Sequence, residues 1–173
     1  MANVSEVLIS EEQLREKVKE IGAQITLDYA GESVFLIGIL KGSVPFMADI
    51  MRAIKLDVQI DFMQVSSYGG DTRTSGVVKI IKDIDEDITG RNVIIIEDII
   101  DTGLTLDYLK SYLSGRGCKS LKIATMLDKP SRRRVNLEPD YYGFKVDDLF
   151  IVGYGLDLNQ EYRNLPYISW IKE

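Results

Sequence analysis

Residues 93–105 read Val93-Ile94-Ile95-Ile96-Glu97-Asp98-Ile99-Ile100-Asp101-Thr102-Gly103-Leu104-Thr105. The run of branched aliphatic residues at the start of this stretch predicts a short strand that is buried on both faces. Two adjacent carboxylates follow that strand, and a polar loop then leads into a helical pattern of apolar residues. The order of strand, polar loop and helix predicts an α/β protein whose ligands bind at the carboxyl ends of its strands.

The polar loop has the composition of a phosphate site. Backbone N–H groups at a helix N-terminus bind anions, while a glycine allows close approach and two threonines add hydroxyl groups. The acids Glu97, Asp98 and Asp101 would repel a phosphate unless they bind ribose hydroxyls, hold a metal or accept a proton. A phosphorylated sugar that arrives with magnesium meets these conditions. Taken singly, Asp101 could be a helix cap, and the other two acids could be solvated charges at a strand end.

Patterns on both sides of this stretch extend the α/β prediction. Ser10 and Gln13 form a capping box before an apolar stripe at helical spacing, and Pro45 suits the first turn of a second helix. Further strands are expected at residues 34–40, 58–62, 121–127 and 150–154, and a long Gly/Ser/Thr-rich loop at residues 66–76. Since no repeat or linker interrupts the chain, we expect one domain over residues 1–173, with a mainly parallel central sheet flanked by helices.

The composition excludes several kinds of chemistry. The chain of 173 residues contains no histidine and a single cysteine, Cys118. Serine–histidine hydrolysis, histidine-ligated zinc and an internal disulfide are therefore excluded. Proton transfer must rely on Asp, Glu, Lys or Tyr, and any metal is expected to be a hard cation on oxygen ligands.

The charge and hydropathy of the chain restrict its partners. With 21 basic and 27 acidic residues the net charge is −6, so the chain has no global attraction for nucleic acid. The longest apolar run, residues 34–40, is far shorter than the ~20 residues that cross a bilayer. The start of the chain lacks a basic segment followed by an apolar block. We expect a soluble cytoplasmic protein that binds neither nucleic acid nor a membrane.

Residues 93–105 resemble the phosphoribosyl-pyrophosphate signature of the type I phosphoribosyltransferases, and are most similar to the hypoxanthine-guanine branch. Further segments resemble the family in the family's own order. Residues 40–43 resemble its pyrophosphate loop, which usually has a non-proline cis peptide before its lysine, and Ser67-Tyr68 resembles the start of its lid. Asp128-Lys129-Pro130 resembles the segment with the base-binding lysine, and residues 150–157 with Arg163 resemble the purine-stacking segment. The resemblance implies the type I fold, with a small hood over the carboxyl ends of the strands.

The resemblance also implies a role for each matching residue at the sugar phosphate. The 5′-phosphate would be held by the loop residues Asp101, Thr102, Gly103, Leu104 and Thr105. Asp101 would also act as general base toward the purine N7. Glu97 and Asp98 would bind the ribose hydroxyls directly or through Mg²⁺, and Asp157 would help to hold a second Mg²⁺. Some relatives have a lysine where this chain has Leu104, so we expect an altered substrate affinity.

The remaining roles concern the leaving group and the base. Lys41, Gly42 and Arg163 would neutralise the leaving pyrophosphate. Lys129 would donate to the 6-oxo group, Phe150 would stack on the base, and the backbone of Ile151 and Asp157 would contact its edge. Ser67 and Tyr68 would open a lid over residues 66–76. The alternative for Lys129 is an ion pair with Asp128 or with a neighbouring surface carboxylate.

The activity implied is transfer of a phosphoribosyl group from 5-phosphoribosyl 1-pyrophosphate to hypoxanthine or guanine, with Mg²⁺ as cofactor, in a homodimer or homotetramer. Two other classes of protein stay open. An RNA-binding regulator on the same fold would need a broad basic face, to which Arg132-Arg133-Arg134 would contribute; we expect that run to be a solvated or subunit-contact surface instead. A non-catalytic nucleotide-binding module would explain the phosphate loop but not Lys129, Phe150 and Asp157.

Overall fold

The computed structural model describes residues 4–67 and 78–172. Its larger sheet has six strands in the order β4-β3-β2-β5-β6-β7. These strands are β2 (Val34–Leu40), β3 (Val58–Ser67), β4 (Val78–Lys82), β5 (Asn92–Ile100), β6 (Ser120–Asp128) and β7 (Tyr141–Lys145). All neighbouring pairs are parallel except β3 and β4, which are antiparallel. The predicted mainly parallel central sheet is confirmed.

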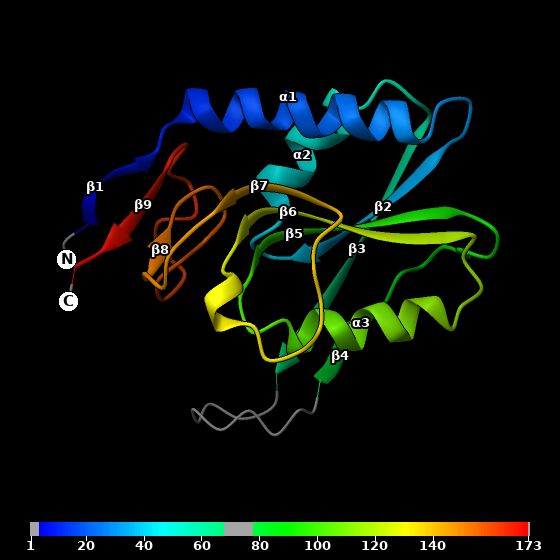
Figure 1. Cartoon of the computed structure of the whole chain (residues 1–173). Coiled ribbons are helices and arrows are strands. Elements are labelled where there is room, and N and C mark those ends of the chain that lie inside the picture. The colour runs from blue at the N-terminus through cyan, green and yellow to red at the C-terminus, as the bar shows by residue number, and fades with distance from the viewer. Residues whose placement is uncertain (1–3, 68–77, 173) are drawn as a thin grey trace.

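Helices cover both faces of this sheet (Figure 1). Helices α1 (Glu11–Asp28) and α2 (Val44–Ala53) lie on one face, and α3 (Leu104–Ser114) lies on the other. Strand β5 supplies side chains to both layers: Ile94 and Ile96 pack in the core under α1 and α2, and Val93 and Ile95 in the core under α3. All four side chains are fully buried, as their unbroken apolar run predicts.

The first helix begins where its sequence predicts. Ser10 Oγ accepts from the Gln13 N–H at 3.1 Å, and Gln13 Oε1 accepts from the Ser10 N–H at 2.8 Å, which completes the capping box. The apolar stripe of α1 is buried against the sheet and α2. None of the helices in the described part of the chain combines the length and apolar character needed to cross a membrane.

A second, antiparallel sheet lies beside the carboxyl ends of the parallel strands (Figure 1). It has the order β1-β9-β8 and consists of β1 (Val4–Ile9), β9 (Ile168–Ile171) and β8 (Ile151–Val152). Chain segments from both ends of the sequence thus form the small hood that the resemblance implies. Residues 153–167 connect β8 to β9 in a series of turns.

The prediction of a strand at residues 150–154 was wrong about its length. It is reduced to Ile151–Val152 and belongs to the small sheet. The cause is the backbone after it, because Gly153, Tyr154 and Gly155 have φ values of 98°, 48° and 98°, which no extended strand adopts.

Other differences lie at the edges of the sheets. The short strands β1, β4, β7 and β9 were not predicted from the sequence. The strand predicted at residues 58–62 is longer, and Ile60, expected to be inward, is 40% exposed, whereas Val58 and Phe62 on the same face are partly buried. The loop expected at residues 66–76 lies outside the described residues from Tyr68 onward, and Ser67 ends β3.

Candidate active site

The loop between β5 and α3 surrounds a hollow at the carboxyl end of the sheet. Gly103 precedes α3 in the left-handed conformation, with φ of 81°, and Thr102 Oγ1 accepts from the Leu104 N–H at 3.4 Å. The hollow has a volume of about 230 Å³, and its lining includes Glu97, Asp98, Asp101, Thr102, Gly103 and Thr105. The structure therefore gathers the predicted phosphate and sugar residues around one space.

Glu97 and Asp98 form an acidic pair at this edge. The Asp98 N–H donates to Glu97 Oε1 at 3.2 Å, and the Ile99 N–H donates to Asp98 Oδ1 at 2.7 Å. Burial raises the pKa of Glu97 well above its usual range, and the charge of Asp98 raises it further. Burial also raises the pKa of Asp98. Two neighbouring carboxylates that resist ionisation in this way would be stabilised by a bound cation.

The predicted pyrophosphate loop contacts this pair. The Leu40–Lys41 peptide is cis, as the resemblance implies. A Cβ on Gly42 would lie 1.7 Å from Asp98 Oδ2, and a Cβ on Gly155 would lie 2.0 Å from the Gly42 carbonyl oxygen. Only glycine fits at either position. The loop after β2, the acidic pair near the end of β5 and the turn after β8 therefore meet in van der Waals contact.

Two cations converge beside that contact. Lys41 Nζ donates to Gln160 Oε1 at 3.2 Å, and Arg163 Nη2 donates to the same oxygen at 3.3 Å. Arg163 also forms an ion pair with Asp157 at 2.9 Å and donates to the Gly155 carbonyl at 2.6 Å. Gln160, which the sequence did not single out, thus connects the two predicted pyrophosphate cations.

Both carboxylate oxygens of Asp157, the third predicted metal ligand, are engaged within the protein. One oxygen forms the ion pair with Arg163, and the other accepts from the Gln160 N–H at 2.8 Å. Within residues 4–67 and 78–172, no group of three acidic or cysteine side chains could hold a metal alone. A metal here would have to share substrate oxygens, which is how Mg²⁺ usually binds, with one or two carboxylates. The Glu97–Asp98 pair fits that pattern.

The predicted base-binding residues come from two places: Lys129 follows β6, whereas Phe150 and Ile151 lie at the start of β8. The side chain of Lys129 is 9% exposed; its ammonium donates to the Leu149 carbonyl at 2.6 Å and lies 3.8 Å from Asp148. The next residue, Phe150, has a ring that is 54% exposed, and Ile151 pairs with Trp170 across the small sheet. The alternative prediction, that Lys129 pairs with a neighbouring surface carboxylate, corresponds to Asp148, but 3.8 Å is a long ion-pair distance. Asp128 pairs with a different cation.

Of the three arginines in the run 132–134, Arg132 and Arg134 are exposed, as the expected solvated surface requires, whereas the side chain of Arg133 is only 9% exposed. Arg132 Nε donates to Asp101 Oδ1 at 3.1 Å, and its Nη1 lies 3.4 Å from Asp148. Arg133 pairs with Asp128 and donates to the Asp101 carbonyl at 2.8 Å. These contacts could not be predicted from the sequence, because the partners of Arg132 and Arg133 are brought together only when β5 and β6 pair.

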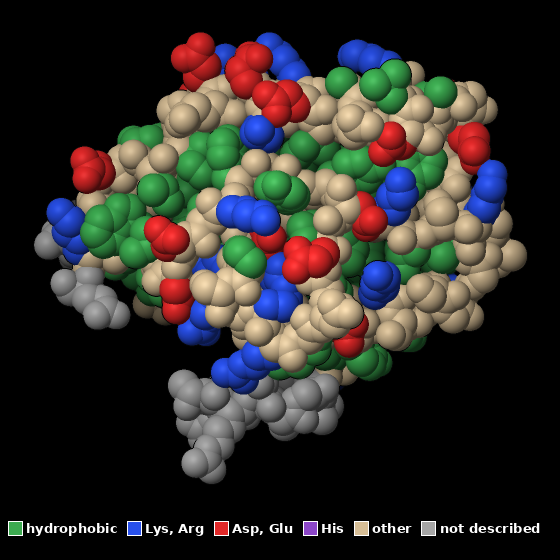
Figure 2. Space-filling view, viewed as in Figure 1, with side chains coloured by type: hydrophobic (Ala, Val, Ile, Leu, Met, Phe, Trp, Pro, Cys, Tyr) green, Lys and Arg blue, Asp and Glu red, His purple; other side chains and the backbone are tan. Residues whose placement is uncertain are grey.

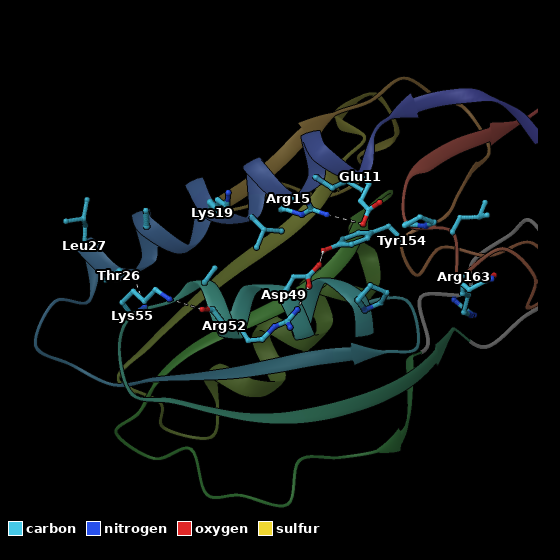
Figure 3. Close-up of a pocket in the computed structure, with 18 residues that line it drawn as sticks. Glu11, Arg15, Lys19, Thr26, Leu27, Asp49, Arg52, Lys55, Tyr154 and Arg163 are labelled. Atoms are coloured by element: carbon cyan, nitrogen blue, oxygen red, sulfur yellow. Dashed lines mark hydrogen bonds and ion pairs between the residues drawn. The ribbon is translucent and has the colours of Figure 1, made fainter.

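A larger hollow lies away from this chemistry, between α1 and α2 (Figure 3). Its volume is about 1250 Å³, and it reaches the turn that carries Arg163. Its charged side chains include local ion pairs, such as Arg15 with Glu11 and Arg52 with Asp49. It contains no phosphate loop and no buried acidic pair, so the smaller hollow after β5 is the candidate active site.

Comparison with known proteins agrees with this choice. The family model described as "Phosphoribosyl transferase domain" matches residues 8–159. The chain belongs to the phosphoribosyltransferase family. Its structure is that of the type I fold.

Similar proteins place the chain in one branch of the family. A hypoxanthine-guanine phosphoribosyltransferase of Bacillus subtilis is 53% identical over 170 residues, which cover 98% of this chain and 94% of the relative. A crystal structure of a hypoxanthine-guanine phosphoribosyltransferase from Bacillus anthracis, with HEPES in its active site, is 54% identical with a TM-score of 0.95 and covers 98% of this chain and 100% of its own. A hypoxanthine phosphoribosyltransferase structure from Staphylococcus aureus is 49% identical with a TM-score of 0.95, covering 98% and 92%.

Proposed function

We propose that this protein transfers the 5-phosphoribosyl group of 5-phosphoribosyl 1-pyrophosphate to N9 of hypoxanthine or guanine, giving IMP or GMP and pyrophosphate in purine salvage. The observation that carries the proposal is the direct contact between the pyrophosphate loop and the acidic pair, as a Cβ on Gly42 would lie 1.7 Å from Asp98 Oδ2. If the two loops bind the leaving group and the sugar as proposed, this contact would bring their sites to opposite sides of the bond that breaks. The relatives named as hypoxanthine-guanine phosphoribosyltransferases support the same reaction.

The sugar phosphate would bind in the hollow after β5. The 5′-phosphate would accept from the backbone N–H groups at the start of α3 and from the hydroxyls of Thr102 and Thr105. Main-chain donors at a helix N-terminus are sufficient for this, although Leu104 supplies no cation. Glu97 and Asp98 would then lie beside the ribose hydroxyls.

Departure of pyrophosphate is the step that needs cations. Lys41 and Arg163, which already share Gln160, would donate to its oxygens and stabilise the negative charge that develops there. Bound Mg²⁺ would supply further charge neutralisation on the pyrophosphate and ribose oxygens. Glu97 and Asp98 would hold it directly or through water, and Asp157 would contribute near the pyrophosphate.

The base would be activated and oriented by two side chains. Asp101 would accept the proton that the purine loses at N7. Its Oδ1 accepts from Arg132, and a carboxylate has a second oxygen that can face the base. Lys129 donates hydrogen bonds and accepts none, so it would bind a 6-oxo group and oppose the amino group of adenine. Phe150, half exposed beside Lys129, would stack on the ring.

Further parts of the proposal concern the whole protein. A cytoplasmic location, a single domain over residues 1–173 and assembly into a dimer or tetramer stay predictions. A nucleic-acid partner is not part of the proposal. Acidic and basic side chains are mixed over the face shown in Figure 2, where an RNA-binding regulator would need a broad basic area.

The proposal is tested by incubating the purified protein with 5-phosphoribosyl 1-pyrophosphate, Mg²⁺ and hypoxanthine. We expect pyrophosphate and IMP to form in equal amounts, with no pyrophosphate released when hypoxanthine is omitted. Release of pyrophosphate without IMP would indicate hydrolysis, and release of neither product would support a non-catalytic nucleotide-binding module.

A further inference from the structure

The carbonyl groups of the phosphate loop all accept hydrogen bonds from within the protein. The Asp101 carbonyl accepts from Arg133 Nη1 at 2.8 Å, the Thr102 carbonyl from the Arg134 N–H at 2.9 Å, and the Gly103 carbonyl from the Asp107 N–H at 2.9 Å. Carbonyl and N–H groups of a peptide point in opposite directions. Fixing these carbonyls therefore fixes the direction of the N–H groups that follow them, which are the donors proposed for the phosphate.

Arg133 is the only side chain among these donors, and it is nearly buried. Its side chain is 9% exposed, and its partner Asp128 is 0% exposed. Arg133 also packs against the loop with its aliphatic part, because a Cβ on Gly103 would lie 3.0 Å from Arg133 Cδ. Arg133 thus contacts both the space behind Gly103, where Val135 also packs, and the Asp101 carbonyl.

Burying this ion pair costs free energy, because its hydrogen bonding is incomplete. Asp128 Oδ2 and Arg133 Nε are buried and have no hydrogen-bond partner in the described structure. Buried ion pairs are often no more stable than apolar residues of the same size. A pair with incomplete hydrogen bonding is therefore weak as a stabilising element, and its contact with the loop suggests another role.

We propose that Arg133 is a positioning residue for the 5′-phosphate subsite, and that Asp128 is the counter-ion that allows its charge to be buried. Arg133 holds the peptide between Asp101 and Thr102 so that its N–H group faces the phosphate. Asp128 immediately precedes Lys129, whose N–H donates to the Ile100 carbonyl at 2.9 Å. The pair therefore connects the phosphate loop with the strand end that carries the base-binding lysine. This inference rests on the proposed function for the identity of the phosphate.

Four variants separate a positioning role from a structural one: Arg133→Met, Arg133→Lys, Asp128→Asn and the double variant Arg133→Met/Asp128→Asn. The single Met variant leaves Asp128 buried without its cation, so we expect a lower Tm. The double variant removes both charges, and we expect its Tm to return close to that of the unmodified protein. Arg15→Met, on the exposed face of α1, is the matched control.

Two measurements decide between these roles. Calorimetry gives the affinity of each variant for ribose 5-phosphate and for ribose, and kinetics give its KM for 5-phosphoribosyl 1-pyrophosphate. Loss of a charge-assisted hydrogen bond that orients the loop predicts about ten-fold weaker ribose 5-phosphate binding and a similar rise in KM, with kcat changed less. Both effects should persist in the double variant, be partly relieved in Arg133→Lys, and be absent in Arg15→Met. Ribose binding, which needs no phosphate subsite, should not change.

Recovery of both Tm and ribose 5-phosphate affinity in the double variant would overturn the positioning role and leave a structural ion pair. Unchanged affinity in a folded Arg133→Met protein would overturn it as well. Failure of the proposed function looks different: the unmodified protein would then form no IMP, while the effect of the variants on ribose 5-phosphate binding would still show whether Arg133 positions the loop.

Discussion

At the scale of single residues, the chemistry depends on how Asp101 and Lys129 are held. Asp101 accepts from Arg132 at 3.1 Å, Arg132 lies 3.4 Å from Asp148, and Asp148 lies 3.8 Å from Lys129. Alternating charges thus connect the proposed general base with the proposed base-recognition cation. Asp101, Arg132 and Asp148 are each about half exposed, so these pairs orient the side chains more than they stabilise the fold.

We expect Asp101→Asn to lower kcat by about 10²–10⁴, because an amide cannot accept the proton of the base. The amide keeps the shape of the side chain, so KM for 5-phosphoribosyl 1-pyrophosphate should change little. Single-turnover measurements should be used, since slow product release could mask the chemical step. Asp107→Asn, in the first turn of α3, is the control and should leave kcat nearly unchanged. An unchanged kcat in Asp101→Asn would contradict the general-base role of Asp101.

Lys129→Gln should relax the discrimination between hypoxanthine and adenine. An ammonium only donates, whereas an amide can also accept from the 6-amino group. We expect the ratio of kcat/KM for the two bases, about 10⁴ or more when a buried polar contact is mismatched, to fall by at least ten-fold. Lys145→Gln, on the exposed part of β7, should keep the original ratio. If both variants kept it, Lys129 would not contact position 6.

The sequence predicted the residues that carry the chemistry better than the residues that hold them. Glu97, Asp98 and Asp101 stand together in the chain, so their spacing alone indicates a site. Lys41 contacts Gln160 across 119 residues of the sequence, and Arg132 contacts Asp101 across 31. Such partners are defined only by the folded chain, and no local pattern identifies them.

At the scale of elements, the site depends on three loops that pack without space between them. The loop after β2 lies against the end of β5, and the turn after β8 lies against the loop after β2. Glycine at both contacts allows the backbones to approach this closely. Helix α3 follows directly and directs its N-terminus at the hollow.

Gly42→Ala tests this packing. The added Cβ would lie 1.7 Å from Asp98 Oδ2, so either the acidic pair or the loop must move. A displacement of about 1 Å in a catalytic group can cost roughly 10² in rate, and we expect a loss of kcat/KM of that order. Gly115→Ala is the matched control, since its Cβ would meet no atom closer than 3.5 Å and its φ is −66°. Equal activity of both variants would contradict the close contact.

Elements with a strong internal pattern were predicted, and elements defined by a neighbour were not. Helix α1 carries its own capping box and apolar stripe, and β5 its own apolar run. Strands β4 and β7 lie at the edges of the large sheet, and each contains five residues. Their short alternating patterns become strands because β3 and β6 offer free edges, which no local sequence shows.

At the scale of the whole molecule, an acidic protein must bind a highly charged anion. With a net charge of −6, the chain as a whole repels 5-phosphoribosyl 1-pyrophosphate. Lys41 and Arg163 supply local positive charge, while the partly buried pair Glu97–Asp98 opposes it. A divalent cation between the pair and the substrate would reverse that repulsion.

We therefore expect activity to require Mg²⁺ absolutely. Exhaustive chelation should abolish IMP formation, and Mg²⁺ added in excess of the chelator should restore it, with Mn²⁺ as a plausible substitute. Glu97→Gln/Asp98→Asn should need a higher Mg²⁺ concentration for half-maximal rate. Full activity after exhaustive chelation would contradict the assignment of the acidic pair to a metal.

The most direct test of the proposed function compares hypoxanthine, guanine, xanthine and adenine in parallel, with 5-phosphoribosyl 1-pyrophosphate and Mg²⁺, by measuring pyrophosphate release and nucleotide formation. Because Lys129 can only donate to position 6, we expect efficient turnover of hypoxanthine or guanine and a kcat/KM for adenine lower by about 10⁴. Comparable kcat/KM values for adenine and hypoxanthine would contradict the 6-oxopurine assignment, and no turnover of any base would contradict the proposed reaction itself.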